Sequence, residues 1–163
     1  MTPMPVPPLK RRRLLAGLGA LATLGLAAPA RAAAKTLPPS RALPAELAQA
    51  LAARQPLVVM VSLHGCPWCQ VVREHYLAPM HAEEGLHVVQ VDWGSALATQ
   101  TVDGAPITHG ELARAWKVKL APTVLFLGAG GRELAERLEG GSPDFYSGYL
   151  DQRLEQARRA LAG

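Results

Sequence analysis

The residues best suited to covalent chemistry are the chain's two cysteines, Cys66 and Cys69, which are three positions apart. The preceding run, Leu57 to Leu63, is continuously apolar, which predicts a strand buried on both faces. Residues 70–80 have helical character, so the pair falls where a strand turns into a helix. Free N–H groups and the dipole at a helix N-terminus stabilise a thiolate. We therefore predict that Cys66 is an attacking thiol.

The neighbours of Cys66 fit this chemistry. Cys69 lies one turn into the predicted helix, where it can attack a mixed disulfide on Cys66 and release it. Pro67 lacks an N–H and suits the first helical turn. Trp68 is expected to be partly exposed and to contact substrate. His64 is either a cation that stabilises the thiolate or a solvated loop histidine.

Three other interpretations of the pair remain open. A structural disulfide is plausible in an exported protein, but a loop this short contributes little chain entropy. A zinc site needs about four ligands, and only His64 and His75 could join the two cysteines. The thiols could also be inert. The strand-to-helix position favours redox chemistry, so no metal is expected.

The N-terminus has the pattern of an export signal. Residues 10–13 are Lys-Arg-Arg-Arg, Leu14 to Ala30 is an uncharged apolar run, and Ala30-Arg31-Ala32 offers a cleavage site. We predict a signal peptide at residues 1–32, cleaved after Ala32. The arginine pair resembles a twin-arginine signal, although the general export route stays open. An uncleaved membrane anchor is the alternative, but the run is short for a full span.

Charge is concentrated in this leader. Five of the 17 Lys and Arg residues lie in residues 1–32, which leaves 12 against 13 acidic residues in the rest. A nearly neutral remainder argues against nucleic acid or an anionic membrane as a partner. Residues 33–43 have no helical or strand period and contain two adjacent prolines. We therefore expect a flexible lead-in at 33–43 and one folded domain at 44–163.

The pattern along this domain alternates helices and strands, which predicts an α/β fold. Thr108 and Glu111 have the spacing of a capping box, and the segment before them, 93–107, is expected to be a loop. The expected helices are 44–54, 70–80, 108–116 and 142–161, and the expected strands are 57–63, 86–91, 123–127 and 132–138.

Four features in this order resemble the thioredoxin superfamily. They are the strand before His-Gly-Cys-Pro-Trp-Cys, Ala121-Pro122-Thr123 about 55 residues later, the hairpin around Gly128–Gly131, and an amphipathic terminal helix. Residues 74–80 (E-H-Y-L-A-P-M) are similar to periplasmic thioredoxins encoded with sulfur-oxidation systems (SoxW-type) and to the C-terminal domain of the DsbD electron transporter. The resemblance implies a three-layer α/β/α fold with a central mixed sheet of about four strands.

The resemblance also implies a site. Pro122 should follow a cis peptide bond and face the cysteine pair, so that Ala121 and Pro122 offer backbone groups to an extended substrate beside Cys66. Cys66 would be the nucleophile and Cys69 the resolving thiol. No cofactor is implied beyond the redox-active disulfide itself.

The sequence departs from the family at two places. Met60 occupies the position, six residues before the first cysteine, where thioredoxins carry a buried acid. The dipeptide Pro67-Trp68 differs from Gly-Pro and leaves the reduction potential open. The group that assists Cys69 in losing its proton must then be water or another residue, with four candidates: Glu74, Glu83, Glu84 and Asp92.

These observations predict a monomeric periplasmic protein-disulfide reductase. It would take electrons from a membrane thiol-disulfide transporter and pass them to substrate proteins through mixed disulfides. Its only contact with the membrane would be through the export signal. A disulfide oxidase is the alternative enzyme, and a binding or assembly module with a structural disulfide is the alternative outside catalysis.

Overall fold

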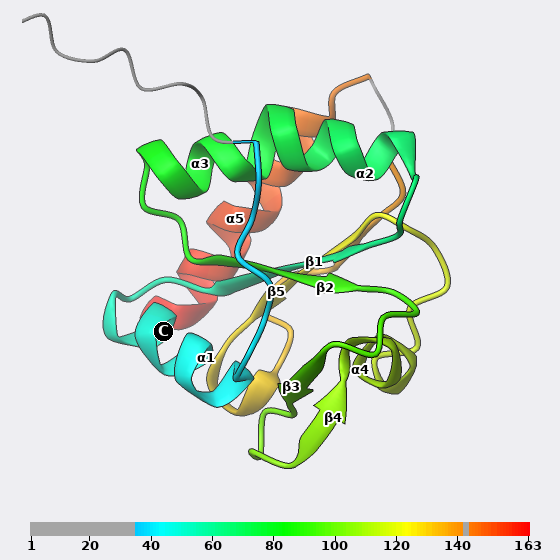
Figure 1. The fold of residues 1–163 in the computed structure, drawn as a ribbon. Coiled ribbons are helices and arrows are strands. Elements are labelled where there is room, and N and C mark those ends of the chain that lie inside the picture. Colours follow the sequence, from blue (N-terminus) through cyan, green and yellow to red (C-terminus); the bar gives the residue numbers. More distant parts are fainter. Residues whose placement is uncertain (1–34, 142–143) are drawn as a thin grey trace, which may run out of the picture. The chain divides into compact units, whose positions relative to one another are not determined.

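The computed structural model describes residues 35–141 and 144–163, so the expected export signal lies outside the described residues. The described chain is an alternation of helices and strands around one main sheet (Figure 1). The elements are α1 (Leu43–Ala52), β1 (Leu57–Ser62), α2 (Pro67–Val72), the π-helix η1 (Arg73–Leu77), α3 (Ala78–Glu83), β2 (Val88–Asp92), β3 (Ala98–Gln100), β4 (Pro106–Thr108), α4 (His109–Ala115), β5 (Thr123–Leu127), the 3₁₀ turn η2 (Ala129–Gly131), β6 (Leu138–Glu139) and α5 (Tyr146–Ala162).

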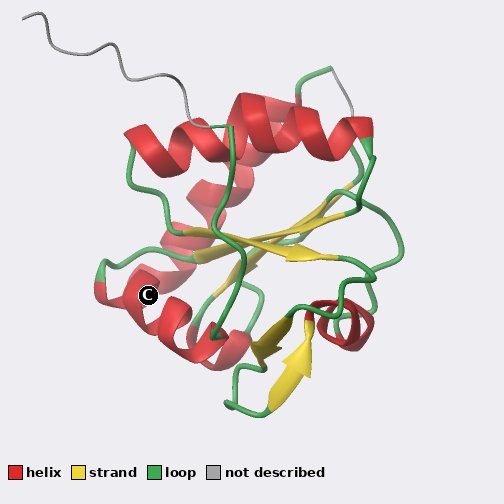
Figure 2. Ribbon diagram, in the orientation of Figure 1, coloured by secondary structure: helices red, strands yellow, loops and turns green. Residues whose placement is uncertain are grey.

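The main sheet is mixed and has four strands in the order β2-β1-β5-β6 (Figure 2). β1 pairs with β2 in parallel, while β5 runs antiparallel to both β1 and β6. Every residue of β1 and β5 is buried, which explains why both strands read as unbroken apolar runs. The expected mixed sheet of about four strands is confirmed.

Helices cover both faces of this sheet, as Figure 1 shows. On one face Met60 and Phe126 pack in a core with residues of α2, α3 and α5. On the other face Val59 and Leu125 pack with residues of α1 and α4. Side chains of a strand alternate between its faces, so β1 and β5 supply both cores. The expected three-layer α/β/α arrangement is confirmed.

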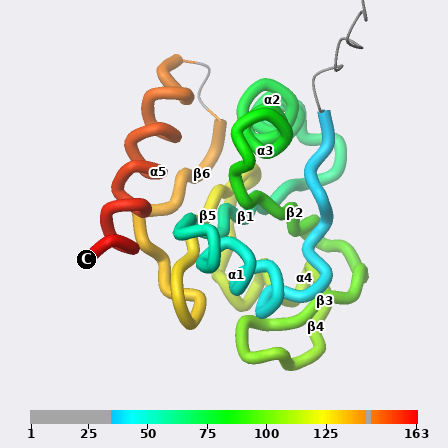
Figure 3. Tube along the Cα trace, turned by 90° about the vertical axis from the view of Figure 1, so that its left-hand side faces the viewer, coloured from blue at the N-terminus to red at the C-terminus, as the bar shows by residue number. Residues whose placement is uncertain are grey.

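The segment before α1 is part of the fold. The expected flexible lead-in at 33–43 is therefore wrong from Leu37 onward. Leu37 and Leu43 are buried, and Pro39 pairs in parallel with Gln90 at the free edge of β2. Figure 3 shows this segment, in blue, beside β2. The Ser40 N–H donates to the Gln90 carbonyl, and the Gln90 N–H donates to the Pro38 carbonyl, both at 2.8 Å. Proline has no N–H to donate to a ladder, but it is tolerated at the edge of a sheet. The adjacent prolines that suggested a linker therefore lie in an edge strand.

The stretch 93–107, expected as a loop, contains a small second sheet. β3 and β4 pair antiparallel within it, with Thr99 opposite Ile107. The helix that follows begins as expected, because Thr108 and Glu111 form a reciprocal capping box. Hydrogen bonds from the Thr108 side chain and backbone hold the pKa of Glu111 below its usual value.

The C-terminal hairpin is shorter than expected. The strand expected at 132–138 is reduced to a bridge between Leu127 and Glu133 and to the two residues of β6. Gly130 and Gly131 both have positive φ, which turns the chain tightly. Leu134 and Ala135 are both buried, so this stretch packs inward instead of alternating along a ladder. α5 begins at Tyr146, not at residue 142.

Tyr146 provides a test of the packing on α5. Its ring lies 5.2 Å from that of Tyr76, and its hydroxyl is buried without a hydrogen-bond partner among the described residues. Burial, and then Tyr76, raises the pKa of this hydroxyl. An unpaired buried hydroxyl is destabilising, so Tyr146→Phe should raise the free energy of unfolding by about 1 kcal/mol. Urea denaturation measures this, with Tyr149→Phe on the exposed part of the same helix as the control. A loss of stability in Tyr146→Phe alone would contradict it.

Candidate functional site

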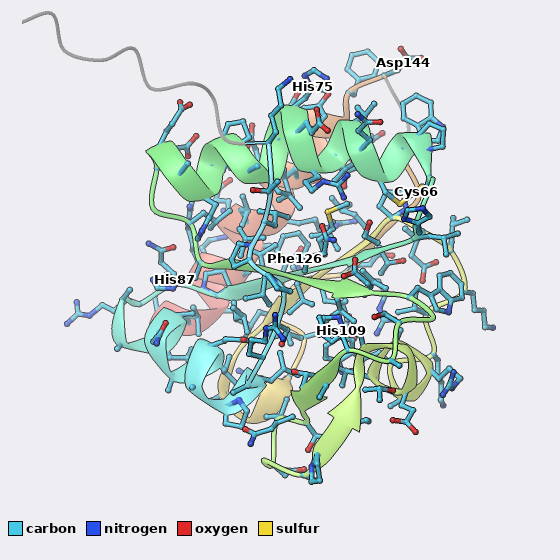
Figure 4. The ribbon with its side chains drawn as sticks, in the orientation of Figure 1. Cys66, His75, His87, His109, Phe126 and Asp144 are labelled. Atoms are coloured by element: carbon cyan, nitrogen blue, oxygen red, sulfur yellow. A yellow bond between two sulfur atoms is a disulfide. The ribbon has the colours of Figure 1, made fainter. Side chains whose placement is uncertain are left out.

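Cys66 and Cys69 form a disulfide at the N-terminus of α2 (Figure 4). Cys66 is the N-cap residue, and its Sγ accepts a hydrogen bond from the Cys69 N–H at 3.1 Å. Pro67 occupies the first turn of the helix, where a missing N–H costs nothing. The sulfur of Cys66 therefore lies among the free N–H groups and the positive dipole end that stabilise an anion.

The two sulfurs differ in their access to solvent. Cys66 is half-buried, whereas Cys69 is 1% exposed and lies in the core on the α2 side of the sheet. The Leu63 N–H points at the Cys69 Sγ at 3.5 Å. A disulfide arriving from solvent can therefore reach Cys66, while Cys69 is placed to act on Cys66 from inside.

The Ala121–Pro122 peptide bond is cis, as the family resemblance implies. It lies directly before β5, and the Ala121 carbonyl oxygen is 3.8 Å from the Cys66 Sγ. Ala121 is partly exposed, whereas Pro122 is buried. Two segments separated by 55 residues thus meet at the more accessible sulfur. Ala121 is placed to offer its backbone to a chain beside Cys66, while the buried ring of Pro122 shapes the loop.

Trp68 is 40% exposed, close to the expectation from its place between the cysteines. It packs against the backbone at Gly141, where an added Cβ would lie 2.9 Å from the Cβ of Trp68. Leu63 and Leu120 are also about half exposed. These side chains give the surface beside Cys66 exposed apolar area.

The position of the usual buried acid is filled by an apolar residue. Met60 is fully buried within the core that also contains Cys69. Of the four acidic candidates, Asp92 alone lines a cleft that also contains Cys66. Glu74 lies on η1, and Glu83 and Glu84 are exposed at the end of α3. Asp92 is therefore the candidate among these four that lies in the cleft beside Cys66.

This cleft is the part of the site that the sequence did not reveal. It has a volume of about 600 Å³ and opens between the turn that precedes α2 and the end of β2. Arg73 reaches into it, because its Nη1 donates to the Ser62 Oγ at 3.4 Å and to the Gln90 Oε1 at 3.3 Å. The one available signal was the spacing of Arg73, four residues after Cys69 and so on the same helix face.

His64 lines the cleft and is exposed. His109, in contrast, is completely buried (Figure 4). Its Nδ1 accepts from the Asp92 N–H at 3.0 Å, and its Nε2 lies 2.8 Å from the Ser40 carbonyl oxygen. His109 thus joins the N-terminal edge strand to the end of β2.

Within residues 35–141 and 144–163, no group of three or more His, Cys, Asp or Glu side chains could hold a metal ion.

This chain is similar to several solved structures and to one family model. No curated protein matches the sequence. Among solved structures, oxidised thioredoxin O2 from Arabidopsis thaliana is 15% identical, with 68% of this chain and 84% of that chain covered and a TM-score of 0.47. The reduced periplasmic thioredoxin SoxS from Paracoccus pantotrophus is 22% identical, with 63% and 99% covered and a TM-score of 0.41. A thioredoxin from Thermus thermophilus is 23% identical, with 74% and 87% covered and a TM-score of 0.45.

A family model described as a thioredoxin-like domain matches residues 43–157. This range runs from α1 into α5 and contains the cysteine pair and the cis-proline loop. The chain belongs to the thioredoxin-like domain family.

Proposed function

We propose that this protein is an exported thiol-disulfide oxidoreductase that works as a protein-disulfide reductase. The observation that carries the proposal is the arrangement of the two sulfurs: a half-buried Cys66 at the N-terminus of α2, bonded to a buried Cys69. A disulfide used only for cross-linking needs neither an accessible sulfur nor a helix N-terminus beneath it.

The reaction follows from this arrangement. In the reduced protein the Cys66 thiolate attacks one sulfur of a substrate disulfide, and the other substrate sulfur leaves as a thiolate and takes a proton from water. The Cys69 thiolate then attacks the Cys66 sulfur. This step forms the Cys66–Cys69 disulfide and releases the second substrate sulfur, which also takes a proton. Two electrons pass from the protein to the substrate.

Neighbouring groups assist both steps. The dipole and N–H groups of α2 stabilise the Cys66 thiolate, which makes it both the attacking group and a good leaving group. The carbonyl of Ala121, 3.8 Å from the Cys66 Sγ, marks where a substrate backbone would run. Trp68 provides apolar contact on the same surface. No cofactor takes part in this scheme.

The proposed location is the periplasm, and the proposed electron donor is a membrane thiol-disulfide transporter. Support comes from the sequence of residues 1–32, whose basic start, apolar middle and small-residue end have the pattern of an export signal. In the described part of the chain, no helix combines the length and apolar character that a membrane crossing requires. The protein would act as a monomer. Its partners would be substrate proteins, which it would bind through mixed disulfides.

The direction of electron flow is tested by the reduction potential of the Cys66–Cys69 couple. We expect a value near the thioredoxin end of the range, about −270 mV, measured by equilibration with dithiothreitol or glutathione buffers. Pro67 between the cysteines is the observation that favours the alternative, because a proline there also occurs in disulfide oxidants. A potential near about −120 mV would reject the reductase and establish the oxidase.

A further inference from the structure

Four of the residues that line the cleft beside Cys66 have small side chains. Ser62 ends β1, Gly65 lies in the turn before Cys66, and Gly94 and Ser95 follow β2. None of these four extends a long side chain into the cleft, which has a volume of about 600 Å³ next to the accessible sulfur.

The cleft and the cis-proline loop flank Cys66 on opposite sides. β1 lies between β2 and β5 in the sheet, and the cleft is built from the ends of β1 and β2. Ala121 and Pro122 precede β5 and do not line the cleft. A substrate chain that runs past Ala121 and presents its disulfide to Cys66 would therefore continue toward the cleft.

The cleft contains a cation, Arg73, that forms no ion pair within the described part of the chain. Arg73 is half-buried, and its guanidinium donates to the neutral oxygens of Ser62 and Gln90, at 3.4 and 3.3 Å. Among the described residues, no carboxylate lies within 4.0 Å of it, whereas three other arginines each pair with a glutamate: Arg137, Arg153 and Arg159. A partly desolvated guanidinium without a counter-charge is a strong site for a carboxylate, which it can bind through two parallel hydrogen bonds.

Gln90 keeps the one acid of the cleft away from Arg73. Its Nε2 donates to the Asp92 Oδ1 at 2.6 Å, while its Oε1 accepts from Arg73. The other Asp92 oxygen lies 3.9 Å from the Nδ1 of His109. The side-chain amide thus separates the two charges and leaves the guanidinium end of the cleft positive.

The helix geometry directs Arg73 to this place. Arg73 is the first residue of η1, and its carbonyl accepts from the Ala78 N–H, five residues on. A π-turn inserts an extra residue into the helix, and such turns recur at functional sites. Here the turn begins at Arg73, whose side chain reaches Ser62 at the end of β1 and Gln90 within β2.

We propose that this cleft is a substrate subsite that binds a carboxylate close to the disulfide attacked by Cys66, with Arg73 as its counter-charge. The preferred substrates are then protein segments with an acidic residue near the reactive cysteine. The proposal rests on the proposed function, because it needs Cys66 as the attacking thiol.

The test uses peptides that each carry one cysteine as a mixed disulfide with neutral 2-thiopyridine. One peptide has only glutamine and glycine around the cysteine, and the others carry a single glutamate at successive positions on either side. Attack by Cys66 forms the protein–peptide disulfide and releases 2-thiopyridone, whose absorbance gives the second-order rate constant. With the reduced protein, the best-placed glutamate should raise this constant about tenfold over the glutamine peptide. Added salt should reduce the ratio.

Variants assign the effect to Arg73. In Arg73→Gln the ratio between the two peptides should fall to about one, while Arg73→Lys should keep part of it. Arg158→Gln, an exposed arginine on α5, is the matched control and should keep the full ratio. Asp92→Asn should raise the ratio, because it removes the repelling charge. Equal rates for all peptides with the wild-type protein, or an unchanged ratio in Arg73→Gln, would overturn the subsite alone. If no peptide reacts faster with the wild-type protein than with Cys66→Ser, the proposed function itself fails.

Discussion

Replacing Cys66 with serine should abolish catalysed disulfide reduction. In an assay in which dithiothreitol reduces insulin with the protein as catalyst, the rate should fall to that of dithiothreitol alone. The serine hydroxyl cannot become the anion that the helix N-terminus stabilises, and Cys69 is too buried to take over. The expected loss is about 10³-fold or more, as is usual when an essential nucleophile is removed. The precipitation of reduced insulin measures it.

Cys69→Ser is the matched control, because it removes the other half of the same disulfide. This variant should also stop turning over, but it should retain one attack for each molecule, since Cys66 is intact. The mixed disulfide then persists, because nothing inside the protein can release it. Mass spectrometry should find substrate bound to Cys69→Ser and none bound to Cys66→Ser. Turnover that survives in Cys66→Ser, or equal trapping by both variants, would contradict the assigned order of the two thiols.

The parts of this site that the sequence predicted are those encoded by local pattern. An apolar run followed by Cys66 and Cys69 predicts a strand followed by a helix. The strand forms where expected, and the helical segment is longer than the expected 70–80, because it runs from Pro67 to Glu83. Ala121-Pro122 before β5 is also a local signature, and its cis bond was expected from the family resemblance. Each of these features depends on a few adjacent residues.

The parts that the sequence did not predict depend on register and on tertiary contact. The cleft requires Arg73 to meet Gln90, which follows only from the pairing of β1 with β2 and from the π-turn at η1. The edge strand around Pro39 was not predicted because adjacent prolines are typical of a linker, and its pairing depends on a distant residue, Gln90. The short β6 was overestimated because two glycine positions and an inward-packed stretch leave it only two paired residues.

His109 illustrates how strongly one such tertiary contact can matter, and its replacement should have the largest effect on stability. His109→Leu has a similar volume but can neither accept from the Asp92 N–H nor donate to the Ser40 carbonyl, so a partly buried backbone donor and a buried acceptor lose their partner. Each unpaired group costs about 1–3 kcal/mol, which predicts a loss of about 3 kcal/mol in the free energy of unfolding. The melting temperature should fall by roughly 10 °C.

The same change at an exposed site separates this effect from the loss of a histidine as such. His75→Leu on η1 replaces an exposed ring and should change stability by less than about 0.5 kcal/mol. Because His109 holds Ser40, its loss should also loosen the edge strand. Relative to the wild-type protein, His109→Leu should therefore show faster hydrogen exchange at the Ser40 and Gln90 amides, with a smaller change in the middle of β1. Equal stability of His109→Leu and His75→Leu, or unchanged exchange at Ser40, would mean that the two hydrogen bonds of the His109 ring do not hold the N-terminal edge of the sheet. If the predicted loss is found, a histidine outside the redox pair fixes the backbone of Asp92, and through it one wall of the cleft beside Cys66.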